Sequence, residues 1–168
     1  MGVNGELEKD INLQIAQKVK ALLEQQGIEV LMTRQDDSAL DSKLEDMKQR
    51  VTLINETKPV LAVSIHQNSY SDSSVRGAQV FYYTDSEVSK EAALMMQEEL
   101  KQMDTAHARE AKGNNTFYML KKTNVPIIIV ECGFLSNPEE AKLLTTEEYQ
   151  DKIAQVISTG IVKWIQQM

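Results

Sequence analysis

The stretch Pro126-Ile-Ile-Ile-Val-Glu-Cys-Gly-Phe-Leu-Ser-Asn137 decides how the rest of the chain is interpreted. Its run of aliphatic residues is typical of a short strand that is buried on both faces. Glu131 follows at the point where this strand is expected to end, and Gly133 allows the chain to turn. Because burial penalises a charged carboxylate, Glu131 either has a partner, such as an Arg or backbone N–H groups, or has a pKa raised toward the range of a general base. This stretch alone favours neither interpretation.

The composition is that of one globular domain. A chain of 168 residues with 42% hydrophobic and 26% charged residues is long enough to bury a proper core. The net charge of -7 argues against nucleic acid or an anionic membrane surface as the main partner. A single cysteine, Cys132, excludes an internal disulfide. No apolar run is long enough to span a bilayer, and the first residues have no signal-peptide pattern.

Helical and strand patterns alternate along the chain. Apolar residues at helical spacing predict helices over 6–26, 43–56, 87–103 and 147–166, with a further helix start at 137–138. Alternating or continuous apolar runs predict strands over 28–33, 60–65, 78–83 (compatible with a sheet edge) and 126–130. A loop is expected over 35–42, and a short strand or extended loop over 117–120. This order predicts an α/β domain with a mostly parallel, twisted sheet flanked by helices on both faces.

Two polar residues come directly after predicted core strands. His66 follows the strand at 60–65 as Glu131 follows the strand at 126–130, and parallel strands place their carboxyl ends at one edge of the sheet. A lone histidine is more often a hydrogen-bonded structural residue, but its pairing with Glu131 favours a metal ligand beside a carboxylate base. Glu8 could join them, although in isolation stabilisation of a helix dipole explains it better. Cys132 is expected to be inert, because apolar surroundings and Glu131 raise its pKa.

Five short motifs then resemble one family in order and spacing, over essentially the whole chain. They are Glu-Lys-Asp-Ile-Asn-Leu at 8–13, Met-Thr-Arg at 32–34, Arg50 with Ile54-Asn55, Ser-Ile-His-Gln-Asn at 64–68, and Val-Glu-Cys-Gly-Phe-Leu-Ser-Asn at 130–137. Each motif is weak alone. The set resembles the zinc-dependent N-acetylmuramoyl-L-alanine amidases, which are bacterial cell-wall hydrolases.

The resemblance implies a zinc held by two histidines and one glutamate, and a separate catalytic glutamate. Carried over by motif, Glu8 and His66 are expected to be zinc ligands and Glu131 the general base. The implied reaction is hydrolysis of the amide bond between the muramoyl lactyl group and L-alanine of peptidoglycan by a zinc-activated water. Asn68 and Arg76, with the loop between them, are expected to shape the substrate groove because they follow His66. The implied place of action is outside the cytoplasm, at the cell wall or secreted.

One family motif is not found in this sequence. The family's first ligand histidine lies in an Asp-Pro-Gly-His-Gly-Gly type motif at the end of the first strand, in front of the segment that here begins at Gly2. The resemblance therefore implies that residues 1–168 form a single amidase-like catalytic domain that is N-terminally truncated, and it does not place His107 at the metal. With two ligands and one strand fewer, weak zinc binding, little activity and an unpaired sheet edge are expected.

Two other functions fit the same residues. A non-catalytic cell-wall or partner-binding module on the same fold would explain an incomplete metal site. A zinc carboxypeptidase-like enzyme would use the same kinds of ligand but would cleave peptide bonds. An assay of muropeptide cleavage distinguishes the non-catalytic module from an enzyme. The masses of the cleavage products distinguish the carboxypeptidase-like enzyme from an amidase.

Overall fold

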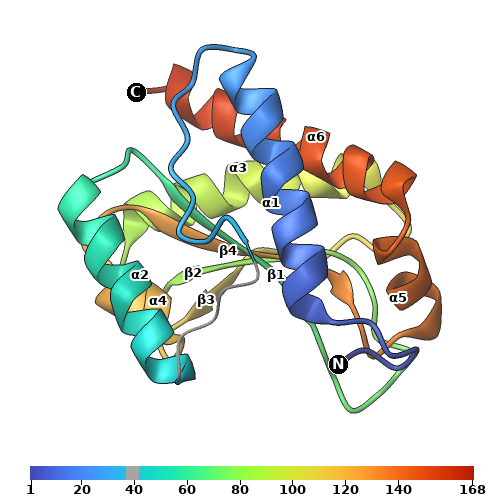
Figure 1. The fold of residues 1–168 in the computed structure, drawn as a ribbon. Helices are drawn as coiled ribbons and strands as arrows, with labels where there is room; N and C mark the ends of the chain where they lie inside the picture. Colours follow the sequence, from blue (N-terminus) through green and yellow to red (C-terminus); the bar gives the residue numbers. More distant parts are fainter. Residues whose placement is uncertain (37–41) are drawn as a thin grey trace.

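The computed structural model describes residues 1–36 and 42–168, in which a central sheet is covered by helices on both faces (Figure 1). The helices are α1 (Glu8–Glu24), α2 (Lys43–Thr57), α3 (Glu87–Met103), α4 (Tyr118–Lys122), α5 (Pro138–Leu144) and α6 (Glu147–Gln166). The strands are β1 (Ala62–Asn68), β2 (Gln79–Tyr83), β3 (Lys112–Asn114) and β4 (Ile127–Phe134). The described strands form one sheet in the order β1-β4-β2-β3. This arrangement confirms the predicted α/β fold with helices on both faces.

The pairing within the sheet is mostly parallel. β1 runs parallel to β4 and β2 parallel to β3, whereas β2 and β4 are antiparallel. The parallel β1–β4 pair is in register from Ala62 opposite Ile127 to His66 opposite Glu131, after which the register shifts. The carboxyl ends of these two strands therefore lie together, as the sequence predicts.

The aliphatic run of β4 is explained by its position inside the sheet. Ile128, Val130 and Cys132 join a large cluster of buried residues that α1, α3 and α6 complete on one face. Ile127 and Ile129 join a smaller cluster on the other face, which includes residues of α2 and α4. Since both faces are covered, both sets of alternating positions must be apolar. Figure 1 shows α1, α3 and α6 on one side of the sheet and α2 and α4 on the other.

The long helices begin and end within two residues of their predicted bounds. Their buried positions carry the predicted spacing, as in α1, where Ile11, Ile15 and Val19 are buried. α5 begins at Pro138, and the side chain of Asn137 accepts hydrogen bonds from the backbone N–H groups of Glu139 and Glu140. Among the described residues, no helix has the length and apolar character needed to cross a membrane.

The predicted strand at 28–33 is wrong. These residues are not assigned to a strand and pair with no described strand. Between this segment and β1 lies a groove of about 1010 Å³, lined by residues of both and by residues of α1 and α2. A strand requires a hydrogen-bonded neighbour, and here the groove separates the segment from the outer edge of β1.

Two other predictions also need correction, and one lies outside the described residues. The strand at 78–83 is present as β2, but β3 covers its outer side, so it is not the edge strand. Residues 117–120 lead into the helix α4, because Leu120 packs into the smaller core cluster and the ring of Phe117 packs against Phe81 with centroids 5.5 Å apart. Most of the predicted loop at 35–42 falls on residues 37–41, outside the described residues.

Candidate active site

His66 and Glu131 lie side by side at the carboxyl ends of β1 and β4. Their Cα atoms are register partners in the parallel ladder, so both side chains project from the same face. A register shift follows between His66 and Asn68, where β1 leaves the ladder. The two residues meet because of the strand order. β4 lies inside the sheet, and β1 is its parallel neighbour.

Glu8 reaches this pair from the first turn of α1. Its Oε1 lies 3.0 Å from Nδ1 of His66, and Nε2 of His66 lies 3.0 Å from Oγ of Ser64. Burial by itself raises the pKa of Glu8, but the hydrogen bonds from His66 and Asn12 and the charge of His66 outweigh it and lower the pKa to about 2. Glu8 therefore stays ionised over the physiological pH range.

Glu131 has the opposite electrostatic environment. Its Oε2 is buried and has no hydrogen-bond partner among the residues that the structure describes. Burial raises its pKa to about 7; the charge of His66 lowers it in part and that of Glu8 raises it further. Among the acidic residues that meet here, Glu131 is the one suited to accept and return a proton near neutral pH. The neighbouring thiol of Cys132 is fully buried, and burial raises its pKa far above the ordinary value, as expected.

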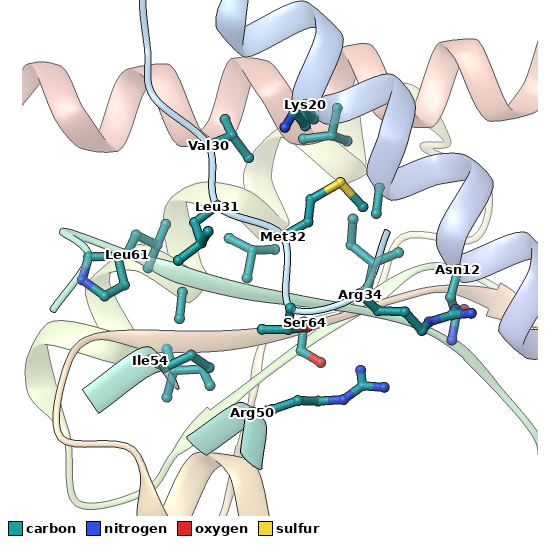
Figure 2. A pocket seen from close by; sticks show the side chains of 18 of the residues that line it. Asn12, Lys20, Val30, Leu31, Met32, Arg34, Arg50, Ile54, Leu61 and Ser64 are labelled. Carbon is teal, nitrogen blue, oxygen red and sulfur yellow. The ribbon is translucent and has the colours of Figure 1, made fainter. Parts of the chain in front are cut away.

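The groove beside β1 opens at these residues. Glu8, His66, Asn68 and Glu131 all line it. Figure 2 shows the guanidinium groups of Arg34 and Arg50 toward the end of the groove where Ser64 and, on α1, Asn12 also lie. These polar groups give one end of a largely apolar groove a polar lining.

Arg76 and His107, which the sequence analysis also considered, lie outside this cluster. Arg76 does not line this groove; its Nη1 donates to Oε2 of Glu139 at 2.7 Å. Nδ1 of His107 lies 2.9 Å from Oδ2 of Asp104. His107 is thus engaged in a local pair rather than in the cluster of Glu8 and His66.

The structure adds three polar residues that the sequence analysis missed. Asn12 donates from Nδ2 to Oε1 of Glu8 at 3.3 Å and accepts at Oδ1 from Nε2 of the buried Gln67 at 3.1 Å. Ser64 completes the contacts of His66. Asn12 had a detectable signal, because it lies four residues after Glu8 and therefore on the same helix face. The only sequence signal for Gln67 and Ser64 was that they lie within two residues of His66.

The donor atoms of Glu8 and His66 are of the kinds that bind metal ions. A carboxylate oxygen of Glu8 and a ring nitrogen of His66 lie 3.0 Å apart, and both are donor types that zinc prefers. Glu131 lines the same groove, and its Oε2 has no hydrogen-bond partner among the described residues. Within residues 1–36 and 42–168, no group of three or more His, Cys, Asp or Glu side chains could hold a metal ion. The described residues thus bring together one carboxylate and one imidazole, which are donor groups of the kinds found in catalytic zinc sites.

Several proteins of similar sequence and fold are N-acetylmuramoyl-L-alanine amidases. A family profile described as N-acetylmuramoyl-L-alanine amidase matches residues 1–163. The chain is 38% identical to the germination-specific N-acetylmuramoyl-L-alanine amidase of Bacillus subtilis, over 94% of this chain and 70% of that protein. It is 31% identical to N-acetylmuramoyl-L-alanine amidase LytC of Bacillus subtilis, over 96% of this chain and 32% of that protein.

Solved structures give the same result. The CwlD amidase from Clostridioides difficile, in complex with the GerS lipoprotein, matches with a TM-score of 0.95 and 40% identity over all of this chain and 91% of that one. The catalytic domain of CwlV, an amidase from Bacillus (Paenibacillus) polymyxa var. colistinus, matches with a TM-score of 0.88 and 32% identity over 98% of this chain and 89% of that one.

The fold and the sequence together define an enzyme class, that of hydrolases acting on the bacterial cell wall. Within it, the chain belongs to the N-acetylmuramoyl-L-alanine amidase family.

Proposed function

We propose that this chain hydrolyses the amide bond between the N-acetylmuramoyl lactyl group and L-alanine of peptidoglycan, with zinc as its cofactor. The observation that carries the proposal is the meeting of Glu8, His66 and Glu131 at one end of the β1–β4 ladder, in a chain of this family. Because the relatives are cell-wall amidases, we also propose peptidoglycan as the substrate and the cell wall, outside the cytoplasm, as the place of action.

Each of the three residues has a proposed role. Glu8 and His66 are zinc ligands, since their donor atoms face each other at 3.0 Å. Bound zinc would supply a Lewis acid that polarises the amide carbonyl and acidifies water. Glu131 accepts the proton of the attacking water and returns it to the leaving amine of the stem peptide. Its raised pKa and its buried Oε2, which has no hydrogen-bond partner in the described part of the chain, support this role.

Two residues are proposed to act on the substrate side. Asn68 lines the groove next to the site and is proposed to contact the muropeptide. Arg76, paired with Glu139, is proposed to hold the wall formed by residues 69–76. An unchanged rate of muropeptide turnover in both Asn68→Ala and Arg76→Ala would remove this part of the proposal.

The metal site is expected to be weak. Two protein ligands are fewer than catalytic zinc sites usually have, so we expect residues 1–168 to bind zinc weakly and to turn over slowly. The same weakness favours the second candidate function, a non-catalytic peptidoglycan-binding module.

The test is cleavage of purified muropeptides in excess Zn²⁺, with products identified by mass spectrometry. We expect a stem peptide with a free L-alanine amine from the wild-type chain and from Glu148→Gln, an exposed control on α6, but not from Glu131→Gln. Cleavage within the stem peptide would instead support a carboxypeptidase-like enzyme. Binding to peptidoglycan without any cleavage would support the non-catalytic module.

A further inference from the structure

Glu140 is a buried carboxylate to which the proposed reaction gives no role. Its side chain is 3% exposed, although it lies in the first turn of α5. Its Oε1 accepts the backbone N–H of Gly77 at 2.9 Å and its Oε2 accepts that of Phe134 at 2.8 Å. Hydrogen bonds from backbone N–H groups to an ionised carboxylate are among the stronger ones in proteins and offset its desolvation.

These two hydrogen bonds join segments that are distant in sequence. Phe134 is the last residue of β4, which carries Glu131, and Gly77 follows the loop at 69–76, which leads out of β1 and His66. Gly133 lets α5 pack closely on β4, since a Cβ there would lie 3.2 Å from Cδ1 of Leu144 and 3.4 Å from Oε2 of Glu140. The carboxylate thus ties the end of this loop to the end of the strand that carries the proposed base.

Neighbours of Glu140 hold the same loop at other points. Oγ of Ser136 accepts the backbone N–H of Tyr70 at 2.9 Å, and Nδ2 of Asn137 donates to the backbone carbonyl of Ser73 at 2.9 Å. We name residues 136–140 the clasp. Successive residues of the clasp contact successive residues of the loop. Residue 136 contacts residue 70, residue 137 contacts residue 73, residue 139 contacts residue 76, and residue 140 contacts residue 77.

The form of these contacts indicates positioning rather than packing. Three of the four go to the backbone of the 70–77 segment, so they fix its course and leave its side chains free to face outward. Tyr70, for example, remains 60% exposed. The attachment of α5 to the core does not depend on them, because Ala141 and Leu144 are fully buried in the large cluster.

We propose that Glu140 is a positioning residue, which through the clasp holds the 69–76 loop against the end of β4 as one wall of the peptidoglycan-binding site. This inference rests on the proposed function, since the loop is assigned to the same substrate. Without Glu140 the loop moves away from Glu131 and binds the glycan-peptide less tightly, while the fold stays intact.

Amide hydrogen exchange and cosedimentation with insoluble peptidoglycan test this on the 168-residue chain, and neither requires turnover. Glu140→Gln keeps the shape but presents an amide N–H₂ to one of the two backbone donors. In Glu140→Gln we expect the amide exchange rates of residues 70–77 to rise roughly tenfold, which is the effect of losing one charged hydrogen bond. The exchange rates in α6 should not change. The dissociation constant for peptidoglycan should rise by a similar factor, roughly tenfold. Ser136→Ala should raise both the exchange rates and the dissociation constant, but by a smaller factor. Glu148→Gln should change neither.

Each outcome decides the role of Glu140. Equal exchange of the 70–77 amides in wild type and variants, or a rise spread equally over all helices, would show a general structural role and overturn the inference. A mobile loop with unchanged peptidoglycan affinity would also overturn it. If Glu140→Gln does not fold, Ser136→Ala carries the same two readouts. Failure of the wild-type chain to cleave muropeptides would remove the proposed function, while exchange and cosedimentation would still decide the positioning role.

Discussion

Replacing Glu131 by Gln is expected to stabilise the folded protein at alkaline pH. Glu131 is placed where its charge is costly, with a buried Oε2 that has no hydrogen-bond partner within residues 1–36 and 42–168. Its pKa is raised from 4.5 to about 7, mainly by burial. The folded chain therefore binds a proton more tightly than the unfolded chain between these pH values, and protonation favours folding. The stability due to this group is fully present below pH 4.5 and is lost as the pH rises through about 7.

The size of the effect follows from the pKa values. A raise from 4.5 to about 7 corresponds to about 3 kcal/mol of stability lost at high pH, since one pKa unit is about 1.4 kcal/mol. Gln has the same shape and no charge, so Glu131→Gln should be more stable than wild type by about 3 kcal/mol near pH 9 and about equal to it near pH 4. For a chain of this length that is on the order of 10 °C in the unfolding midpoint.

Urea unfolding followed by circular dichroism, in zinc-free buffer across this pH range, measures the difference. Glu148→Gln, exposed on α6, serves as the matched control and should follow wild type at every pH. Glu8 is present in both proteins, so its own titration largely cancels in the comparison. If Glu131→Gln is equally or less stable than wild type near pH 9, or differs by the same amount at all pH values, the buried-charge reasoning is refuted.

Three further predictions concern single positions. Glu8→Gln should reduce the loss of stability on acidification, because the pKa of Glu8 is lowered from 4.5 to about 2. The stability due to this group is present above pH 4.5 and is lost as the pH falls through about 2, and a smaller difference than in wild type between the urea midpoints near pH 3 and near pH 6 would show it. Gly77→Ala should destabilise by roughly 2–4 kcal/mol in urea unfolding, because Gly77 has φ +99° and a Cβ would clash with the carbonyl oxygen of His107. Ile157→Ala, at a fully buried position of α6, should cost about 3 kcal/mol in the same assay, through lost burial and a cavity; an unchanged urea midpoint would contradict either of the last two.

The parts of the fold that were predictable are those set by local pattern. The β4 run could be placed inside the sheet because only a strand covered on both faces needs apolar residues at successive positions. Residues 28–33 have an equally good strand pattern, but pairing is not a local property, and the groove beside β1 leaves them without a described partner. Residues 117–120 were ambiguous because a short apolar run fits either structure, and the burial of Leu120 decided for a helix.

The residues of the candidate site also differ in how far the sequence predicts them. His66 and Glu131 could be brought together from the sequence, since each comes directly after an apolar run, and the strands that contain these runs pair in parallel with the two residues opposite each other. Glu8 lies 58 residues from His66, and the helix dipole alone explains an acidic residue at its position, so its assignment to this site from the sequence depended on the family resemblance. Glu140 was missed because an acidic residue in the first turn of a helix already has an explanation in the helix dipole. Its burial depends on the loop that it holds, which no local pattern describes.

The claim that Glu8 and His66 form one metal site with Glu131 as a separate base is tested most directly by calorimetric titration with Zn²⁺. Wild type, Glu8→Gln, His66→Ala and Glu131→Gln should be titrated under the same conditions. We predict weak one-to-one binding by wild type, a similar isotherm for Glu131→Gln, and loss of binding in the other two variants. Unchanged zinc binding in Glu8→Gln and His66→Ala would contradict the claim.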